Sequence, residues 1–231
     1  RSFMSLTVSN VTFSYNKKEK PVLKDFSAEF PSGRITALTG ENGCGKTTLA
    51  KLIMGILKPY EGRIMLAEEG QERKEDGSRE TDLSVLSLAE KGRKIGYVMQ
   101  NPARQIFSTS VSEEIRYGLK NMGLNEDETN YRATEFLRYF DIEKYADTFP
   151  FFLSQGEKQR LVLASVLAME PAWLILDEPT ASLDIKRKTL LGNYLTKIRK
   201  DKNCGIIVIT HDREFAKKYT DREIRMGDRD A

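Results

Sequence analysis

A glycine-rich octapeptide, GENGCGKT at residues 40–47, constrains this chain more than any other feature. It follows a short, mostly apolar run, Ile35 to Thr39, which is typical of a strand covered on both faces. From Lys46 onward, apolar residues recur with helical spacing as far as Leu57, and Pro59 follows shortly after. The sequence therefore predicts a strand, a glycine loop and a helix in direct succession.

A loop of this kind binds phosphate for physical reasons. Glycines let backbone N–H groups curl around an anion, and the helix N-terminus adds the positive end of its dipole. In the pattern GxxxxGK[ST], the lysine reaches the β- and γ-phosphates and the following hydroxyl can bind Mg²⁺. An ordinary glycine-rich turn is the alternative, but the flanking strand and helix favour a nucleotide site. The residues expected to contact the nucleotide here are Asn42, Gly43, Cys44, Gly45, Lys46, Thr47 and Thr48.

The composition is that of an ordinary globular protein. Of 231 residues, 39% are apolar and 31% are charged, and 37 basic residues against 34 acidic ones leave a net charge of +3. So small a charge provides no basic field, and we expect no nucleic-acid partner. The longest apolar stretches are far shorter than the roughly 20 residues that span a bilayer, and no signal peptide is recognisable. A single histidine excludes a multi-histidine metal site, and the distant cysteines Cys44 and Cys204 argue against structural zinc.

Hydrophobic periodicity predicts an α/β core interrupted by a helical segment. Strand-like runs lie near both ends of the chain, at Phe26 to Phe30, Ile35 to Thr39, Ile64 to Leu66, Ile95 to Met99, Trp173 to Leu176 and Ile206 to Ile209. Helical stripes occupy the middle, at Val111, Ile115 and Leu119, at Ala133, Phe136, Leu137 and Phe140, and in a helix that starts near Ser154. Residues 67–93 carry many charges and little periodicity, and we interpret them as an extended surface hairpin or a mobile loop.

Two acidic residues follow the buried run Trp173 to Leu176. In a phosphate-loop protein this arrangement places one carboxylate beside Mg²⁺ and the next beside the attacking water. We therefore expect Asp177 to hold the metal and Glu178 to hold the water. A strand that merely ends in solvated acids before a turn at Pro179 is the alternative. Kinases, GTPases and many ATPases remain open on the phosphate loop alone.

Five further segments resemble those of the nucleotide-binding domain of ABC ATPases, and the resemblance covers nearly the whole chain. The segment LSQGEKQR at residues 153–160 is similar to the signature of that family. Four shorter motifs are also similar to family motifs. Tyr15 in FSY resembles the adenine-stacking aromatic and Gln100 in YVMQNP resembles the Q-loop. Asp184 in ASLD resembles the D-loop, and His211 in ITHD resembles the switch histidine. Taken alone, Tyr15 could equally be the last inward residue of a strand through Val11 and Phe13.

The resemblance implies a fold and an activity. The fold would be a P-loop NTPase (RecA-like) core with an antiparallel β subdomain and an inserted helical subdomain. The whole chain would form one ATPase domain, with residues 1–103 and 170–231 as core and β subdomain and 104–169 as the helical part. ATP and Mg²⁺ would be the cofactors. The implied catalytic residues are Lys46, Glu178 and His211, and the implied metal ligands are Thr47, Gln100 and Asp177.

The resemblance also implies that two ATPase subunits share each site. Ser154, Gln155, Gly156 and Asp184 would then contact ATP held by the opposite subunit of a homodimer or heterodimer. Ser154 with Glu157 three residues later is also a capping box, which by itself could explain both residues. The segment departs from the usual LSGGQ at Gln155 and Glu157. A carboxylate at the third helical position brings negative charge near a phosphate, which leaves the affinity and rate of this site open.

Other segments favour one branch of the family. QNPARQIF at residues 100–107 and ASVLAMEP at 164–171 resemble ATPases of energy-coupling-factor transporters, which import vitamins or transition-metal ions such as cobalt and nickel. This branch implies a transmembrane coupling subunit as partner and a peripheral location on the cytoplasmic face of the cell membrane. Ala103 and Arg104 depart from the usual acids, so a fragment of a longer two-ATPase chain remains possible. The alternatives are a conventional ABC importer or exporter subunit and a nucleotide switch that does not hydrolyse ATP.

Overall fold

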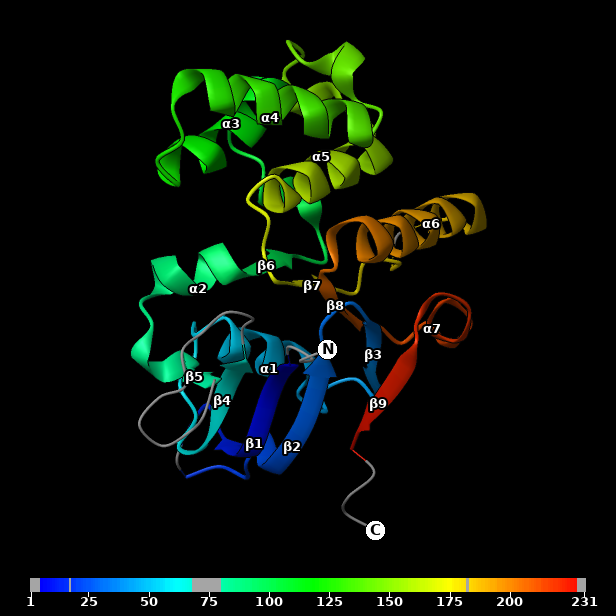
Figure 1. Ribbon diagram of the computed structural model, residues 1–231. Helices are drawn as coiled ribbons and strands as arrows, with labels where there is room; N and C mark the ends of the chain where they lie inside the picture. Colours follow the sequence, from blue (N-terminus) through cyan, green and yellow to red (C-terminus); the bar gives the residue numbers. More distant parts are fainter. Residues whose placement is uncertain (1–4, 17, 68–79, 182, 228–231) are drawn as a thin grey trace.

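The computed structural model describes residues 5–16, 18–67, 80–181 and 183–227, and it contains two β-sheets with helices packed around them (Figure 1). The central sheet is parallel, in the order β6-β7-β8-β3-β9. Its strands are β3 (Ile35–Gly40), β6 (Ile95–Val98), β7 (Trp173–Asp177), β8 (Gly205–Ile209) and β9 (Arg222–Met226). The second sheet is antiparallel, in the order β2-β1-β4-β5. Its strands are β1 (Ser5–Phe13), β2 (Leu23–Pro31), β4 (Glu61–Ala67) and β5 (Glu80–Asp82).

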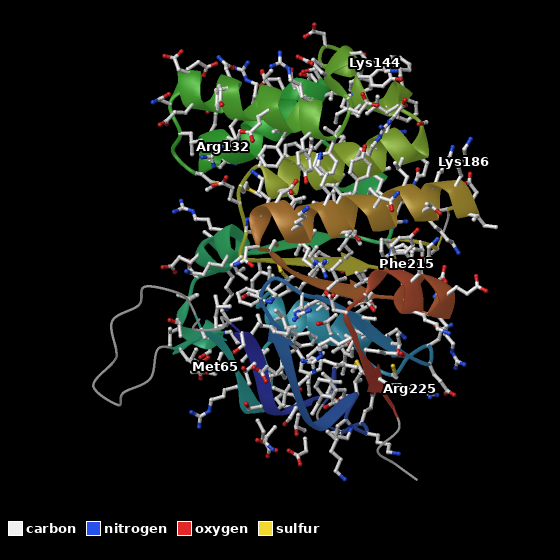
Figure 2. All side chains as sticks on the ribbon, turned by 45° about the vertical axis from the view of Figure 1, so that its right-hand side comes forward. Met65, Arg132, Lys144, Lys186, Phe215 and Arg225 are labelled. Atoms are coloured by element: carbon white, nitrogen blue, oxygen red, sulfur yellow. The ribbon has the colours of Figure 1, made fainter. Side chains whose placement is uncertain are left out.

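Helices cover the parallel sheet on both sides. Helix α1 (Lys46–Ile53) lies between the two sheets, and α6 (Ile185–Lys202) and α7 (Arg213–Tyr219) cover the opposite face (Figure 1). A separate helical layer consists of α3 (Val111–Asn121), α4 (Glu126–Tyr139) and α5 (Gln155–Leu167). The short helix α2 (Leu88–Lys94) precedes β6, and 3₁₀ turns occupy Leu83–Val85, Pro102–Arg104, Glu143–Tyr145 and Pro150–Phe152. Figure 2 labels Phe215 between α6 and α7, where it joins the core beneath α6.

The protein has two hydrophobic cores because successive side chains of the central strands point to opposite faces of the parallel sheet. In β7, Leu174 and Leu176 join a cluster with the helical layer and α6, whereas Trp173 and Ile175 join a cluster with α1 and the antiparallel sheet. Every residue of β7 and of β8 is buried. A strand covered on both faces is mostly apolar, which is the pattern that the sequence shows in β8 and, as far as Asp177, in β7. The α/β core and the helical segment predicted from the sequence are confirmed, as is the antiparallel β subdomain that the family resemblance implied.

The helix after the glycine loop is shorter than predicted. The apolar spacing indicated a helix as far as Leu57, but α1 ends at Ile53. Gly55 adopts a left-handed φ of 74°, which ends the helical path. Ile56 was expected on the buried stripe and is instead 59% exposed, so that prediction is wrong.

The interpretation of residues 67–93 as a hairpin or mobile loop is only partly correct. Strand β5 pairs antiparallel with β4, with Met65 opposite Asp82, so a hairpin is present. Residues 68–79 lie outside the described residues. Helix α2 was not predicted, although Ser87 and Glu90 form a capping box that the sequence displays.

Across the described ranges 5–16, 18–67, 80–181 and 183–227, none of the helices is both long and apolar enough to span a membrane.

Candidate nucleotide-binding site

The predicted phosphate loop, acidic pair and histidine meet at one edge of the parallel sheet. Strands β7, β8 and β3 are neighbours in that order, so their carboxyl ends lie side by side. A cleft of about 490 Å³ opens there. It is lined by Tyr15, Val22, Asn42, Gly43, Gly45, Lys46, Thr47, Thr48, Gln100, Glu178 and His211.

The glycine loop has the curled backbone that phosphate binding requires. Gly40 has a φ of 143°, and a Cβ on it would lie 2.5 Å from the carbonyl oxygen of Met226. The Lys46 ammonium is buried inside the loop and donates hydrogen bonds of 2.8 Å to the carbonyl oxygens of Gly40 and Glu41. Cys44, predicted among the contacts, lines a separate groove beside β9 rather than this cleft, and its Sγ lies 3.8 Å from the Lys46 ammonium.

Asp177 and Thr47 come together as expected for a metal site. The Thr47 hydroxyl lies 3.0 Å from Asp177 Oδ2, and the Tyr97 hydroxyl donates to the same oxygen at 2.9 Å. Burial, followed by the charge and the hydrogen bond of Asp177, raises the pKa of Tyr97, so its proton stays on the hydroxyl. Tyr97 on β6 was not singled out in the sequence, because only the pairing of β6 with β7 brings it to Asp177.

Glu178 and His211 form a pair at the mouth of the cleft. His211 Nδ1 lies 2.8 Å from Glu178 Oε2, so with an ionised carboxylate Nδ1 carries the proton and Nε2 is left for a ligand. The Glu178 side chain is 13% exposed, against 61% for His211. Glu178 has a left-handed φ of 47°, a conformation that costs a non-glycine residue about 1–2 kcal/mol. A hydrogen bond of 2.9 Å from Glu178 N to Ile209 O fixes that backbone.

Neighbouring polar residues hold the segment that carries His211. Thr210 Oγ1 accepts a hydrogen bond of 3.0 Å from Asp212 N, and Lys188 on α6 pairs with Asp212 at 2.5 Å. Burial alone would raise the pKa of Asp212, but the bonds from Lys188 and Phe215 N outweigh it and lower that pKa. The sequence offered no signal for Lys188, which belongs to a helix far along the chain.

Tyr15 is a surface aromatic of the cleft rather than a core residue. Strand β1 ends at Phe13, and Tyr15 beyond it is 58% exposed. Its hydroxyl lies 3.0 Å from Thr48 Oγ1, and its ring meets the ring of Phe13 edge-on. The alternative interpretation of Tyr15 as an inward strand residue is therefore wrong. Gln100 also lines the cleft.

The signature segment lies away from this cleft. Ser154, Gln155 and Gly156 begin α5 in the helical layer, and Asp184 caps α6 through a hydrogen bond of 2.8 Å from Arg187 N. None of these four residues lines the cleft that contains Lys46. The predicted capping box is confirmed, because Glu157 Oε2 accepts the Ser154 N–H at 2.8 Å and Ser154 Oγ accepts the Glu157 N–H at 3.4 Å.

Two glutamines connect these segments and were not predicted. Gln105 accepts the Met99 N–H at 2.6 Å and donates to Tyr97 O at 2.9 Å, which fixes the chain on either side of Val98. Gln159 of α5 is buried and donates to Pro179 O at 3.0 Å, next to Glu178. Both lie in segments whose motifs were recognised, but their partners depend on the tertiary fold.

Comparison with known proteins gives a consistent result. The family described as ABC transporter matches residues 23–181. The energy-coupling factor transporter ATP-binding protein EcfA2 of Clostridium tetani is 36% identical over 96% of this chain and 76% of its own length. The solved structure of cbiO1 from Clostridium perfringens, described as part of the ABC transporter complex cbiONQ, has a TM-score of 0.82 and 35% identity over 96% of this chain and 84% of that one.

A relative from Vibrio vulnificus, named as an ABC transporter ATP-binding protein, is 37% identical over 99% of this chain. The chain spans only 38% of that relative's length. The family match nevertheless covers well over half of the residues and includes both the phosphate loop and the acidic pair. The chain therefore belongs to the ABC transporter family, as an ATP-binding (ABC ATPase) chain.

Proposed function

We propose that this chain hydrolyses ATP in the cleft and that ATP-driven pairing of two such subunits powers solute import through separate transmembrane subunits. One observation carries the proposal: the Glu178–His211 pair, joined at 2.8 Å, shares a cleft with the Lys46 loop. A protein that only binds nucleotide has no need of a buried carboxylate oriented by a histidine at that place. This pair therefore disfavours a switch without turnover.

In the proposed reaction, water attacks the γ-phosphorus in line and the bond to the bridging oxygen of ADP breaks. Glu178 accepts a hydrogen bond from the attacking water and holds it in line. The Lys46 ammonium stabilises the charge that develops on the phosphoryl oxygens, and a His211 ring protonated on both nitrogens would donate from Nε2 to the same oxygens. Tyr15, exposed at the cleft edge, stacks on the adenine ring.

The oxygen atoms near the loop fit Mg²⁺, which prefers hard oxygen ligands. The Thr47 hydroxyl and the Asp177 carboxylate would hold the ion, and the Gln100 side chain lines the same cleft. In the part of the chain that the structure describes, no three His, Cys, Asp or Glu side chains gather to hold a metal unaided. The remaining ligands would be phosphate oxygens and water. When bound with ATP, the ion neutralises charge on those phosphate oxygens.

Two subunits would complete each site. Ser154, Gln155, Gly156 and Asp184 lie outside the cleft of their own chain, at the first turns of α5 and α6. A helix N-terminus beside a serine hydroxyl is an anion site. We assign its ligand as the γ-phosphate held by a second copy or by a paired ATPase subunit. The chain would thus act as one ATPase domain, with residues 104–169 as a helical part that reaches the partner.

A groove on the helical layer is our candidate surface for the transmembrane coupling subunit. The groove has a volume of about 400 Å³, and its lining includes Phe107, Tyr117, Met122 and Met169. Phe107 is 64% exposed and meets the Tyr117 ring edge-on at 4.8 Å. Gln105 also lines the groove and connects it to the segment that carries Gln100. A helix docked there would place the chain at the cytoplasmic face of the membrane, as a peripheral subunit.

The energy-coupling-factor type is the branch that the relatives support best, since two of them are named energy-coupling factor transporter ATP-binding proteins. A conventional ABC importer or exporter subunit remains the second candidate. Co-purification decides between them, because the tagged chain should retain a single coupling subunit from detergent-solubilised membranes in the first case. ATPase activity is tested on the purified chain. We expect Mg²⁺-dependent phosphate release that Lys46→Ala abolishes, and release that persists in Lys46→Ala would refute the proposed function.

A further inference from the structure

Among the described residues, the start of α5 is one of three helix starts with a capping box. The other two are Ser87 with Glu90 on α2 and Asn125 with Glu128 on α4. In each box the glutamate accepts the N–H of the cap residue. Only the box at Ser154 belongs to a segment for which a bound anion is proposed. A carboxylate at that position therefore acts on helix capping and on anion binding at once.

The Glu157 carboxylate is held beside Ser154 and stays ionised. A hydrogen bond from Tyr145, with further bonds from the backbone and side chain of Ser154, lowers the pKa of Glu157 to about 2. The charge of Arg160 also lowers the pKa of Glu157, although Arg160 forms its ion pair, at 3.7 Å, with Asp141, and Lys158 lies over the Phe151 ring at 5.2 Å. Among the residues that the structure describes, no ion pair within 4.0 Å neutralises Glu157.

The capping box also determines which backbone N–H groups at the start of α5 are available to bind an anion. The Ser154 and Glu157 N–H groups are used within the box. The N–H groups of Gln155 and Gly156 have no partner within the helix, because they belong to its first turn. Ser154 Oγ accepts from Glu157 N, while its own proton is directed to the Glu157 carboxylate. Glu157 thus orients the Ser154 hydroxyl and, at the same time, places a negative charge at the anion site.

We propose that Glu157 is a positioning residue that limits the affinity of the signature segment for ATP bound to the opposite subunit, and so shortens the life of the ATP-bound dimer. This inference rests on the proposed function, in which that segment receives the γ-phosphate. Two charges about 5 Å apart in water repel enough to weaken binding about three- to tenfold. The structure therefore assigns Glu157 two opposed effects, which different substitutions separate.

The test uses Glu157→Gln, which removes the charge but keeps an oxygen that can accept the Ser154 N–H. Glu157→Ala removes both the charge and the acceptor. Glu128→Gln is the matched control, because Glu128 occupies the same position in the box of α4. Each is combined with Glu178→Gln to prevent turnover, and ATP-dependent dimerisation is measured by sedimentation. In the background with Glu178 intact, the ATP dependence of phosphate release separates KM from kcat.

We expect Glu157→Gln to lower both the ATP concentration for half-maximal dimerisation and the KM for ATP about three- to tenfold. Glu157→Ala should require more ATP for half-maximal dimerisation than Glu157→Gln. The gain should shrink between ~0.1 M and ~1 M salt, because the screening length falls to about 3 Å. Glu128→Gln should match the parent protein. A Glu157→Gln protein with an unchanged or higher midpoint would overturn the assignment.

The shared site and the role of Glu157 can be refuted separately. ATP binding to the monomer, followed with a fluorescent nucleotide, should be unchanged in Glu157→Gln because Glu157 lies outside its own cleft. If the Glu178→Gln parent binds ATP but never dimerises, the shared site is wrong and the role of Glu157 falls with it. If the parent dimerises and Glu157→Gln has no effect, only the role of Glu157 is overturned.

Discussion

Glu178→Gln tests the proposed catalytic pair most directly. The amide keeps nearly the same shape and an oxygen that can accept from His211 Nδ1, so the pair at 2.8 Å can survive. What is lost is the negative charge that holds the attacking water. Such groups contribute about 10²–10⁴-fold to rate. Because the Glu178 side chain is only 13% exposed, we expect a loss near 10³–10⁴-fold, or about 4–5 kcal/mol in the barrier.

The role of His211 follows from the same geometry and gives a double-mutant test. His211→Ala should cost about 10²-fold, since it removes a charge-stabilising group and leaves Glu178 without its orienting partner. The double variant should be hardly slower than Glu178→Gln alone, because residues that act as a unit are not additive. The assay is phosphate release at saturating ATP and Mg²⁺, with nucleotide binding and the melting temperature as controls. Wild-type turnover in Glu178→Gln, or fully additive losses in the pair, would refute the reasoning.

Three further predictions concern other parts of the chain. Gly40→Ala should lower the free energy of unfolding by about 2 kcal/mol or more, because the new Cβ would lie 2.5 Å from Met226 O and the φ of 143° is strained for alanine. Denaturant-induced unfolding measures this change, and an unchanged denaturation midpoint would contradict the prediction. Tyr97→Phe should raise the Mg²⁺ concentration for half-maximal turnover about tenfold, because Asp177 loses the 2.9 Å hydrogen bond that orients it, whereas an unchanged Mg²⁺ titration would show that the bond is dispensable. The lowered pKa of Glu157 means that the ionised carboxylate stabilises the fold above pH 4.5, its ordinary pKa, and that this stabilisation is lost as the pH falls toward about 2. The melting temperature of the wild type should therefore exceed that of Glu157→Ala above pH 4.5, and the difference should disappear across that interval. A difference that stays constant with pH would contradict this prediction.

Sequence patterns predicted the parts of the fold that depend on local rules. The buried strands β7 and β8 and the phosphate loop could be recognised because two-sided burial requires apolar runs and a curled loop requires glycine. The end of α1 was misplaced because the apolar spacing continued past Gly55, whose left-handed backbone decides the boundary. Helix α2 was missed because its charged sequence lacks an apolar stripe.

The site was predicted unevenly for a related reason. Motifs located the residues that line the cleft, apart from Val22, because the located residues lie in or just beyond the segments that follow the ends of strands. Tyr97, Lys188 and Gln105 were not found, since each one acts through a partner on another element. A tyrosine inside a strand or a lysine inside a helix has no sequence signal of its own until the sheet order brings its partner close.

Gln159 connects the segment at the start of α5 to the segment that carries Glu178 in the same chain. Its amide, buried in α5 only two residues after Glu157, donates at 3.0 Å to the carbonyl oxygen of Pro179, the residue that follows Glu178. An unsatisfied buried carbonyl costs about 1–3 kcal/mol, so the structure strongly resists separation of these two segments. A displacement of the helical layer by a partner would consequently be transmitted to the backbone of Glu178. The same bond that stabilises the fold thus ties the segment at Ser154 to the proposed catalytic carboxylate of the same chain, whereas in the proposed dimer the two would contact phosphates of different sites.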